Sequence, residues 1–434
     1  MPQRSGRVSV ERSTPVTRGR RIVILNQYAL PAGSAGITRH GDIGAELVRR
    51  GYSVTVIASH FNYLTRQPFV GRTMPTRHAG VQFIWLRTGA YSGNDRRRVR
   101  SMVWFSAAAT WAAIRLRPRP DVIIGSSPHL LAGGSAFLAA RLLGRPWVLE
   151  VRDFWPSALV DLGAIARGGR LHTGLERIER YLYAHANAVV TVPPAGHLRL
   201  DEVGIDPAKC IHIPNSVAWD DDSGDAPQPP LTLQQIVASR RGRFILVYVG
   251  SLGVTHDFDT FLKGVATIKS KADDVYQRLA IVLVGDGVER ERIERMTHEM
   301  GLTSISFHSS VEKRVVPWVL SRADAGLMQA GPAEYFKYGL SPNKLFDYFA
   351  AGKPVLISSK MPTIVDEAKA GIRYRPGDPD AVADAVIRMV RTPPDELADM
   401  GARGRELTRT RYSVAAVTDQ YEDLIQALVA ESAR

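Results

Sequence analysis

The 434-residue sequence has little that would cross-link it covalently or anchor it in a membrane. Cys210 is its only cysteine, which excludes an internal disulfide framework and favours a reducing, cytoplasmic location. No apolar run approaches the roughly 18 residues that a membrane-spanning helix needs. Residues 1–21 lack the apolar core of a secretory signal peptide. We interpret residues 1–20 as a disordered basic tail on an otherwise globular chain.

Acidic side chains are scarce in the first half of the chain. Residues 1–214 contain 29 lysines and arginines against 13 aspartates and glutamates, a net charge of +16, whereas the remainder carries 27 against 30, a net charge of −3. This asymmetry predicts that the first half faces an anionic partner. A general preference for arginine over lysine and acidic residues would also produce an excess of positive charge.

Residues 96–119 are the segment best suited to contact that partner. Arginine clusters flank an apolar stretch that contains Trp104, Phe105 and Trp111, and the stretch is too short to span a bilayer. Such a composition suits a helix that lies in the interface of an anionic membrane. It suits equally a helix packed on the core with its arginines in water. The first interpretation predicts a peripheral protein at the inner face of the plasma membrane, and nucleic acid is not an expected partner.

Short runs rich in valine and isoleucine recur along the chain, separated by helix-length segments. This rhythm predicts two α/β domains with parallel sheets. The expected strands are 21–27, 53–59, 81–87, 121–127, 147–153 and 188–193 in the first domain, and 244–250, 279–285, 305–311, 325–330 and 354–358 in the second. The expected domains are 21–217 and 243–411, joined by an acidic, proline-rich linker over 218–242. A final helix within 412–434 is expected to pack back on the first domain.

Ligands of open parallel sheets bind beyond the carboxyl ends of the strands, and polar or glycine-rich segments follow several expected strands of the first domain. Gly33 and Gly36 lie in a turn before a helix that begins near Arg39, an arrangement that suits an anion. Arg152 and Asp153 end an apolar strand, where a charged pair suits a cleft better than a core. The alternative for Gly33 and Gly36 is a turn needed only for tight packing. The alternative for Arg152 and Asp153 is a structural ion pair at the end of the strand. The absence of GxGxxG argues against a dinucleotide site.

In the second domain, Gly250, Gly253 and His256 follow the first strand, and Asp286 lies between two glycines after the next. Both loops suit a nucleotide phosphate or base, although plain turns would have the same composition. Asp257 and Asp259 resemble a metal-binding pair, but we interpret them as a helix N-cap and a first-turn carboxylate. Because no metal-ligand pattern appears, neither a metal nor another cofactor is expected.

The most specific segment is 338–355. Ser341 is expected to cap a helix whose first residue is Pro342. Lys344 and Asp347 then lie three residues apart on one face near the positive end of the helix. The lysine can hold a diphosphate and the carboxylate can accept hydrogen bonds from ribose hydroxyls. A surface ion pair is the alternative, although it does not explain the motif around it.

With these motifs, the chain resembles the retaining glycosyltransferases of family 4, which have the GT-B fold of two Rossmann-like domains facing across a cleft. The resemblance extends from Ile22 to about Tyr421 and is closest to the branch that assembles O-antigen, capsule and other cell-surface polysaccharides. It is carried by the turn at 31–39, the segments 151–157, 213–215, 250–253 and 284–287, and the blocks 341–347 and 351–355.

The resemblance implies an acceptor site in the first domain and a nucleotide-sugar site, such as one for a UDP-sugar, in the second. The family's two signature glutamates align with Gly339 and Asp347, so only the second carboxylate is present. Its diphosphate-binding Arg and Lys align with Ser251 and His256. The positive charge is therefore expected from Lys344, with Arg39 or Arg152.

The expected reaction is transfer of a hexose or N-acetylaminosugar, with retention, to a glycan acceptor that is expected to be lipid-linked. Lys344 and the amides of Gly33 and Gly253 would stabilise the leaving diphosphate. Asp153 would orient or deprotonate the acceptor hydroxyl, unless the leaving phosphate does so. A sugar-nucleotide 2-epimerase, a nicotinamide dehydrogenase and a non-catalytic polyanion-binding protein are the alternatives. Release of nucleoside diphosphate with and without acceptor would distinguish them.

Overall fold

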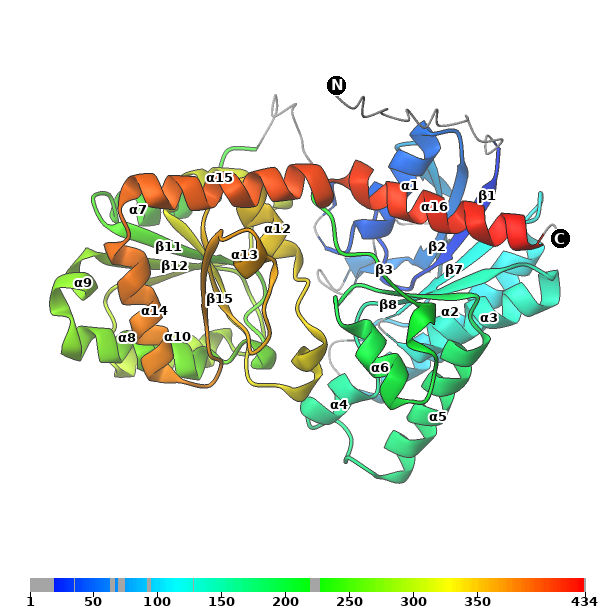
Figure 1. The fold of residues 1–434 in the computed structure, drawn as a ribbon, viewed down its shortest axis with the longest axis horizontal. Coiled ribbons are helices and arrows are strands. Elements are labelled where there is room, and N and C mark those ends of the chain that lie inside the picture. The colour runs from blue at the N-terminus through cyan, green and yellow to red at the C-terminus, as the bar shows by residue number, and fades with distance from the viewer. Residues whose placement is uncertain are drawn as a thin grey trace, which may run out of the picture.

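The chain folds into two α/β lobes that lie side by side (Figure 1). The computed structural model describes residues 19–34, 36–62, 67–68, 75–91, 95–127, 129–218 and 227–432. The basic tail expected over 1–20 falls almost entirely outside these residues, as does the acidic part of the expected linker. Each lobe has one sheet of mainly parallel strands with helices on both faces, so the predicted α/β class with two Rossmann-like sheets is confirmed.

The N-terminal lobe contains an eight-stranded sheet in the order β10-β9-β8-β7-β1-β2-β6-β5. All neighbours are parallel except β5, which pairs antiparallel with β6 at the edge. The strands are β1 (Arg21–Leu25), β2 (Ser53–Ser59), β5 (Thr76–His78), β6 (Val81–Leu86), β7 (Val122–Ser126), β8 (Trp147–Val151), β9 (Ala188–Thr191) and β10 (Cys210–His212). A separate two-stranded ribbon pairs β3 (Phe61–Asn62) with β4 (Gln67–Pro68).

Alternate residues of β1 face two different cores, which is why the strand reads as an unbroken apolar run. Ile22 and Ile24 pack with α1 (Arg39–Arg49) and the C-terminal helix. Val23 and Leu25 pack with helices on the opposite face. The remaining helices of this lobe are α2 (Arg96–Arg115), α3 (Leu130–Leu143), α4 (Ser157–Asp161), α5 (Arg170–His185), α6 (Gly196–Glu202) and the short η1 (Pro207–Lys209).

The C-terminal lobe contains a six-stranded parallel sheet in the order β13-β12-β11-β14-β15-β16. Its strands are β11 (Phe244–Val249), β12 (Leu279–Val284), β13 (Ile305–His308), β14 (Ala325–Met328), β15 (Val355–Ser358) and β16 (Gly371–Tyr374). Its helices are α7 (Leu231–Ala238), η2 (Val254–His256), α8 (Phe258–Lys271), α9 (Asp273–Arg278), α10 (Arg290–Glu299), η3 (Lys313–Val315), α11 (Val316–Ser321), η4 (Glu334–Tyr338), α12 (Asn343–Ala350), α13 (Ile364–Glu367), α14 (Pro379–Arg391) and α15 (Pro394–Arg411).

The chain passes between the lobes twice. After β10 it leaves the first lobe, and after α15 it returns as α16 (Val414–Ser432), which runs across the N-terminal lobe in line with α15 (Figure 1). The two crossings are hydrogen-bonded to each other, from Val217 N to Tyr412 O at 2.9 Å and from Val414 N to Val217 O at 3.2 Å. Val417, Tyr421 and other α16 side chains are buried in the N-terminal core. Of the helices in the described residues, none is long and apolar enough to cross a membrane.

Candidate active site

A cavity of about 310 Å³ lies where the carboxyl ends of the two sheets meet. The N-terminal lobe contributes residues that follow β8, β9 and β10, and the C-terminal lobe contributes η2, the end of β14 and the segment that leads into α12. The lining residues are Ile37, Arg152, Asp153, Phe154, Val192, Pro193, Asn215, Thr255, His256, Met328, Ala330, Phe336, Gly339, Leu340, Ser341, Pro342 and Asn343. The cavity therefore has one wall from each lobe.

The loop after β8 brings Arg152 and Asp153 to the N-terminal wall. Asp153 is exposed to the cleft, yet the protein around it raises the pKa of its carboxyl by desolvation, and the nearby charge of Arg152 offsets part of that rise. The backbone N–H of Arg152 donates to Ser127 Oγ at 2.8 Å, which fixes the start of the loop. A carboxylate with a raised pKa is better matched to accepting a proton from a hydroxyl.

Lys344 lies on α12 and reaches the loop after β11. Its Nζ donates to the Tyr248 hydroxyl at 2.6 Å and lies 3.9 Å from the centre of the Tyr248 ring. Burial lowers the pKa of Lys344 to about 7. No carboxylate forms a salt bridge with it within the described residues. An anion that binds beside Nζ would thus supply the charge partner that this described part of the chain does not.

Glycines allow this lysine to approach the backbone. Gly250 has φ of +147°, and a Cβ added there would lie 2.8 Å from Lys344 Nζ. A Cβ at Gly285 would lie 1.8 Å from the carbonyl oxygen of Gly250. The loops after β11 and β12 therefore run in direct contact, and any larger residue at either position would separate them.

Gly253 and His256 form the next turn of the same loop. His256 lines the cavity, and its Nδ1 lies 3.4 Å from Gly253 N and 3.3 Å from Gly253 O. Burial, together with the charge of Lys344, lowers the pKa of His256 to about 3. The imidazole is therefore neutral and can offer a hydrogen bond without adding charge. Asp257 caps α8 by accepting from Thr260 N, and Asp259 lies in the first helical turn, so the prediction of a helix N-cap and a first-turn carboxylate is confirmed.

Asp347 and Asp286 have different surroundings. Asp347 is half-buried on α12, and desolvation raises the pKa of its carboxyl, with Lys313 lowering it and Asp42 of the other lobe raising it further. Asp286 instead accepts from the backbone and hydroxyl of Ser310, at 2.8 and 2.6 Å, and from Arg290 at 2.5 Å. Asp286 thus joins two loops in this structure, while Asp347 keeps its carboxylate available.

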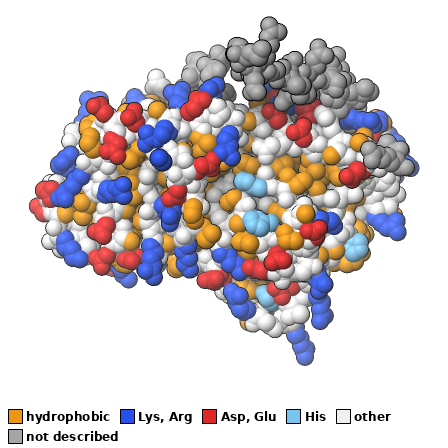
Figure 2. All heavy atoms as spheres, viewed as in Figure 1, with side chains coloured by type: hydrophobic (Ala, Val, Ile, Leu, Met, Phe, Trp, Pro, Cys, Tyr) orange, Lys and Arg blue, Asp and Glu red, His pale blue; other side chains and the backbone are white. Residues whose placement is uncertain are grey.

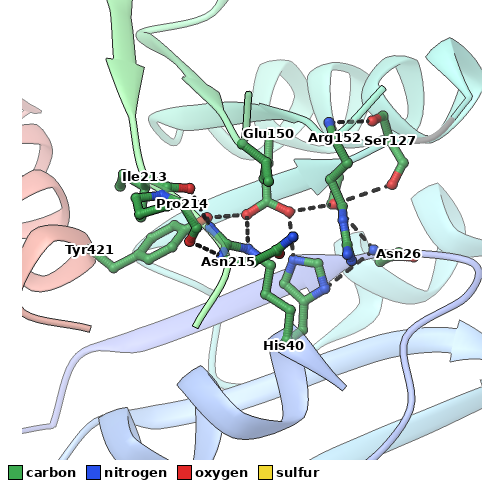
Figure 3. Close-up of polar contacts among 12 residues, drawn as sticks. Asn26, His40, Ser127, Glu150, Arg152, Ile213, Pro214, Asn215 and Tyr421 are labelled. Carbon is green, nitrogen blue, oxygen red and sulfur yellow. Dashed lines mark hydrogen bonds and ion pairs between the residues drawn. The ribbon is translucent and has the colours of Figure 1, made fainter. Parts of the chain in front are cut away.

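Arg39 does not reach the cavity, which corrects the expectation that it binds diphosphate. Its side chain is buried, with Nε donating to Glu150 Oε2 at 3.1 Å and the other nitrogens donating to Pro214 O, Ile213 O and the Tyr421 hydroxyl. Figure 3 shows Ile213, Pro214, Tyr421 and His40 gathered around Glu150. Since every nitrogen of the guanidinium is engaged by the protein, Arg39 has none left for a phosphate.

Glu150 is the centre of this buried network. His40 Nε2 lies 2.9 Å from Oε1, Ser126 donates to the same oxygen at 2.7 Å, and the Tyr421 hydroxyl donates to Oε2. Burial alone would raise the pKa of Glu150, but the charges of Arg39 and His40 outweigh it and hold the pKa well below its usual range. The sequence did not predict this network. The only signal was a glutamate inside an otherwise apolar strand.

The structure differs in detail from two further expectations. Ser341 does not cap α12: the helix begins at Asn343, Pro342 is its N-cap with extended backbone (ψ 137°), and no side chain caps it. The Ser341 Oγ instead lies 3.4 Å from Asn215 N, and the Asn215 side chain donates to Ser341 O at 2.6 Å. Gly33 and Gly36 lie before α1 with φ of +76° and +128° but do not line the cavity, whereas Ile37 does.

Within the described residues, no group of three or more His, Cys, Asp or Glu side chains is arranged to hold a metal ion. Lys344 and Asp347 lie on α12, close behind the cavity wall that Ser341 and Asn343 form. The site thus combines a neutral imidazole, a lysine of lowered pKa and two carboxylates of raised pKa. That combination suits an anionic ligand with hydroxyl groups.

Sequence profiles of known families match both lobes. The profile described as "Glycosyl transferase 4-like domain" matches residues 35–216, and that described as "Glycosyl transferases group 1" matches residues 243–392. A probable glycosyltransferase, WbjE, of Pseudomonas aeruginosa is 23% identical over 321 residues, covering 72% of this chain and 76% of that protein. A putative colanic acid biosynthesis glycosyl transferase, WcaI, of Escherichia coli is 23% identical over 334 residues, covering 74% and 78%.

Solved structures share the fold. Sucrose-phosphate synthase from Thermosynechococcus elongatus superposes with a TM-score of 0.70 at 17% identity, covering 95% of this chain and 100% of that one. HepE of Anabaena in complex with UDP and glucose superposes with a TM-score of 0.62 at 14% identity, covering 94% and 99%. Both likenesses extend over the two lobes together.

Proposed function

Because the chain belongs to the GT-B glycosyltransferases, we propose that it transfers a sugar from a nucleoside-diphosphate sugar to a lipid-linked glycan, with retention of the anomeric configuration. The relative named for colanic acid biosynthesis supports a role in making cell-surface polysaccharide. The complex of HepE with UDP supports a UDP-sugar as the first donor to test.

The observation that carries the proposal is the cavity with one wall from each lobe. Its N-terminal wall has a carboxylate beside an arginine, and behind its C-terminal wall lies a lysine to which the described residues offer no acidic partner. A donor whose diphosphate meets Lys344 and whose sugar occupies the cavity would lie across from Asp153. An acceptor hydroxyl would then enter from the N-terminal side.

In the proposed reaction, the bond between C1 of the donor sugar and the diphosphate oxygen breaks, and a bond from C1 to the acceptor oxygen forms on the same face. Lys344 and the backbone of the glycine-rich loop near Gly253 stabilise the charge that develops on the leaving diphosphate. The acceptor proton passes to Asp153 or to the departing phosphate oxygen. Closure of the lobes excludes water, which would otherwise hydrolyse the donor.

The direct test is incubation with a panel of UDP- and GDP-sugars, with and without lipid-linked acceptors, while free nucleoside diphosphate is measured. We expect acceptor-dependent release and an α-linked product from an α-linked donor by NMR. An isomerised sugar without acceptor would instead indicate a 2-epimerase. No turnover with any donor, combined with binding to polyanions, would indicate a binding protein. We further propose that no metal is needed, so excess EDTA should leave the rate unchanged.

Asp153→Asn tests the assignment of the proton acceptor. The change keeps the shape of the side chain and removes its charge, so transfer should fall by roughly 10²-fold or more. UDP affinity should stay near that of the wild-type protein, because the diphosphate contacts lie in the other lobe. If the variant keeps most of its turnover, Asp153 is not the base, and the leaving phosphate accepts the proton instead.

We also propose that the protein works on an anionic membrane surface. Three neighbouring helices of the N-terminal lobe have exposed apolar side chains among arginines: Trp104 (61% exposed) and Trp111 (57%) on α2, Leu142 (68%) on α3 and Tyr181 (49%) on α5. On the face seen in Figure 2, basic side chains project from the lower tip of this lobe, where Figure 1 places the loop between α4 and α5. A lipid-linked acceptor would be presented at such a surface.

A further inference from the structure

Tyr338 belongs to the C-terminal lobe by sequence but to the N-terminal lobe by packing. It is the last residue of η4, and its side chain is 1% exposed within the hydrophobic core of the other lobe. There its ring lies 4.6 Å, centroid to centroid, from that of Phe154. Phe154 directly follows Asp153. The tyrosine therefore packs under the loop that carries the candidate base.

Hydrogen bonds hold the tyrosine at both ends. Its hydroxyl donates to Glu202 Oε2 in α6, and its carbonyl oxygen accepts from Ala195 N at 2.9 Å. The neighbouring Lys337 Nζ lies 2.8 Å from Glu202 Oε1. Glu202 also lies 3.4 Å from Arg199 of its own helix. A buried aromatic ring with a paired hydroxyl and a paired backbone forms a specific contact, not a loose apposition of two surfaces.

The next residue must be glycine for this contact to form. Gly339 has φ of +91°, and a Cβ added to it would lie 2.5 Å from Pro194 Cγ and 2.7 Å from Pro194 Cδ. Pro194 belongs to the N-terminal lobe. Gly339 is also the position at which the family resemblance expects the first signature glutamate. The structure supplies a reason for its absence: a side chain there would push the two lobes apart.

We infer that Tyr338 is a positioning residue that locks the donor-binding lobe onto the acceptor-binding lobe and fixes the Asp153 loop over the donor. This inference rests on the proposed glycosyl transfer for its catalytic meaning. Phe154, Phe336 and Gly339 line the cavity on either side of the contact. With the ring in place these walls exclude water, and acceptor attack is favoured over donor hydrolysis.

Tyr338→Ala tests the inference through two readouts. The radius of gyration in solution, from small-angle X-ray scattering, should increase because the lobes are no longer held together. The ratio of donor hydrolysis to transfer, with the active UDP-sugar and acceptor, should rise roughly tenfold. UDP affinity should stay within about twofold of wild type, because Lys344 and Asp347 are unchanged. Gly339→Ala, which keeps Tyr338 but collides with Pro194, should shift both readouts in the same direction.

Tyr183→Ala is the matched control. Tyr183 is buried in the same core, but its hydroxyl donates at 2.9 Å to Glu179, a residue of its own lobe. The Tyr183→Ala variant should have lower thermal stability but an unchanged radius of gyration and an unchanged ratio of donor hydrolysis to transfer. The inference is overturned if Tyr338→Ala and Gly339→Ala both keep the wild-type radius. If the wild-type protein turns over no donor, the proposed function fails, while the scattering comparison still decides whether Tyr338 holds the lobes together.

Discussion

Lys344 and Asp347 are the two residues whose roles are most directly measurable. Replacing either with alanine should weaken UDP binding by roughly 1–3 kcal/mol, because each removes a charge-assisted hydrogen bond in a partly buried site. Isothermal titration calorimetry with UDP and GDP measures the change. Lys271→Ala is the control, because Lys271 is an exposed lysine of the same lobe that pairs with Asp380 at 3.2 Å. If both variants bind like the control, the assignment of the diphosphate site is wrong.

The lowered pKa of Lys344 predicts a proton-linked binding step. In the empty protein, burial holds that pKa near 7, so above pH 7 the amine is mostly neutral. A bound diphosphate raises the pKa, so the complex holds more protons than the free protein and UDP binding weakens as pH rises above 7. Calorimetry at pH 8 in two buffers of different ionisation enthalpy should report an uptake approaching one proton. Lys344→Met should abolish this proton uptake. If the uptake is unchanged in that variant, a group other than Lys344 binds the proton.

At the scale of a secondary-structure element, α2 is the test of membrane contact. Its N-cap Asp95 accepts from Arg98 N at 3.0 Å, and one exposed stripe runs through Arg100, Trp104 and Trp111. Arginines at an anionic surface contribute roughly 1 kcal/mol each. Changing Arg96, Arg97 and Arg100 to glutamine together should therefore weaken binding to phosphatidylglycerol vesicles by roughly 10²-fold or more in a flotation assay at low salt. Arg98 is left unchanged because it is partly buried beside Tyr91.

The control for this experiment removes the same charge from the other lobe. Arg278, Arg295 and Arg388 are on C-terminal helices, and their replacement by glutamine should leave vesicle binding close to wild type. Binding should also weaken as salt rises, since the attraction is screened. Equal losses in the two triple variants would indicate a general charge effect and reject a specific docking face.

At the scale of the whole molecule, α16 makes the folding of the N-terminal lobe depend on a helix that follows the C-terminal lobe in the chain. It buries Val417, Tyr421, Leu424, Ile425 and Leu428 against the N-terminal lobe, each worth roughly 1.5–3 kcal/mol. Ending the chain at Tyr412 should therefore destabilise the N-terminal lobe selectively, by more than about 5 kcal/mol. Hydrogen exchange should show loss of protection in β1 and α1, while UDP still binds the C-terminal lobe.

Ending the chain after Val429 is the control for that truncation, because it keeps all five buried side chains. It should leave exchange protection in both lobes unchanged. If the truncation at Tyr412 also preserves protection of β1 and α1, the N-terminal lobe is stable without its returning helix and the packing of α16 contributes little.

The central strands of both sheets were predictable from the amino-acid sequence. Strands such as Phe244–Val249 and Leu279–Val284 are buried on both faces, so they must be continuous apolar runs, and such runs are visible without a structure. Two of the edge strands, β10 and β16, at 210–212 and 371–374, have one strand neighbour each and only partial burial. They leave no such signature, and the sequence did not predict them.

The candidate site likewise has some features that the sequence determined and others that only the tertiary structure decided. The sequence determined which loops hold the candidate site residues, because small or charged residues directly after buried strands suit a ligand site at the edge of the sheet better than a core. Only the tertiary structure decided what each charge faces. Arg39 was expected to meet a phosphate, but its partners Pro214 and Tyr421 lie 175 and 382 residues further along the chain. Tyr338 is buried by the opposite lobe. Burial and charge pairing depend on segments that only folding brings together, and no local pattern encodes them.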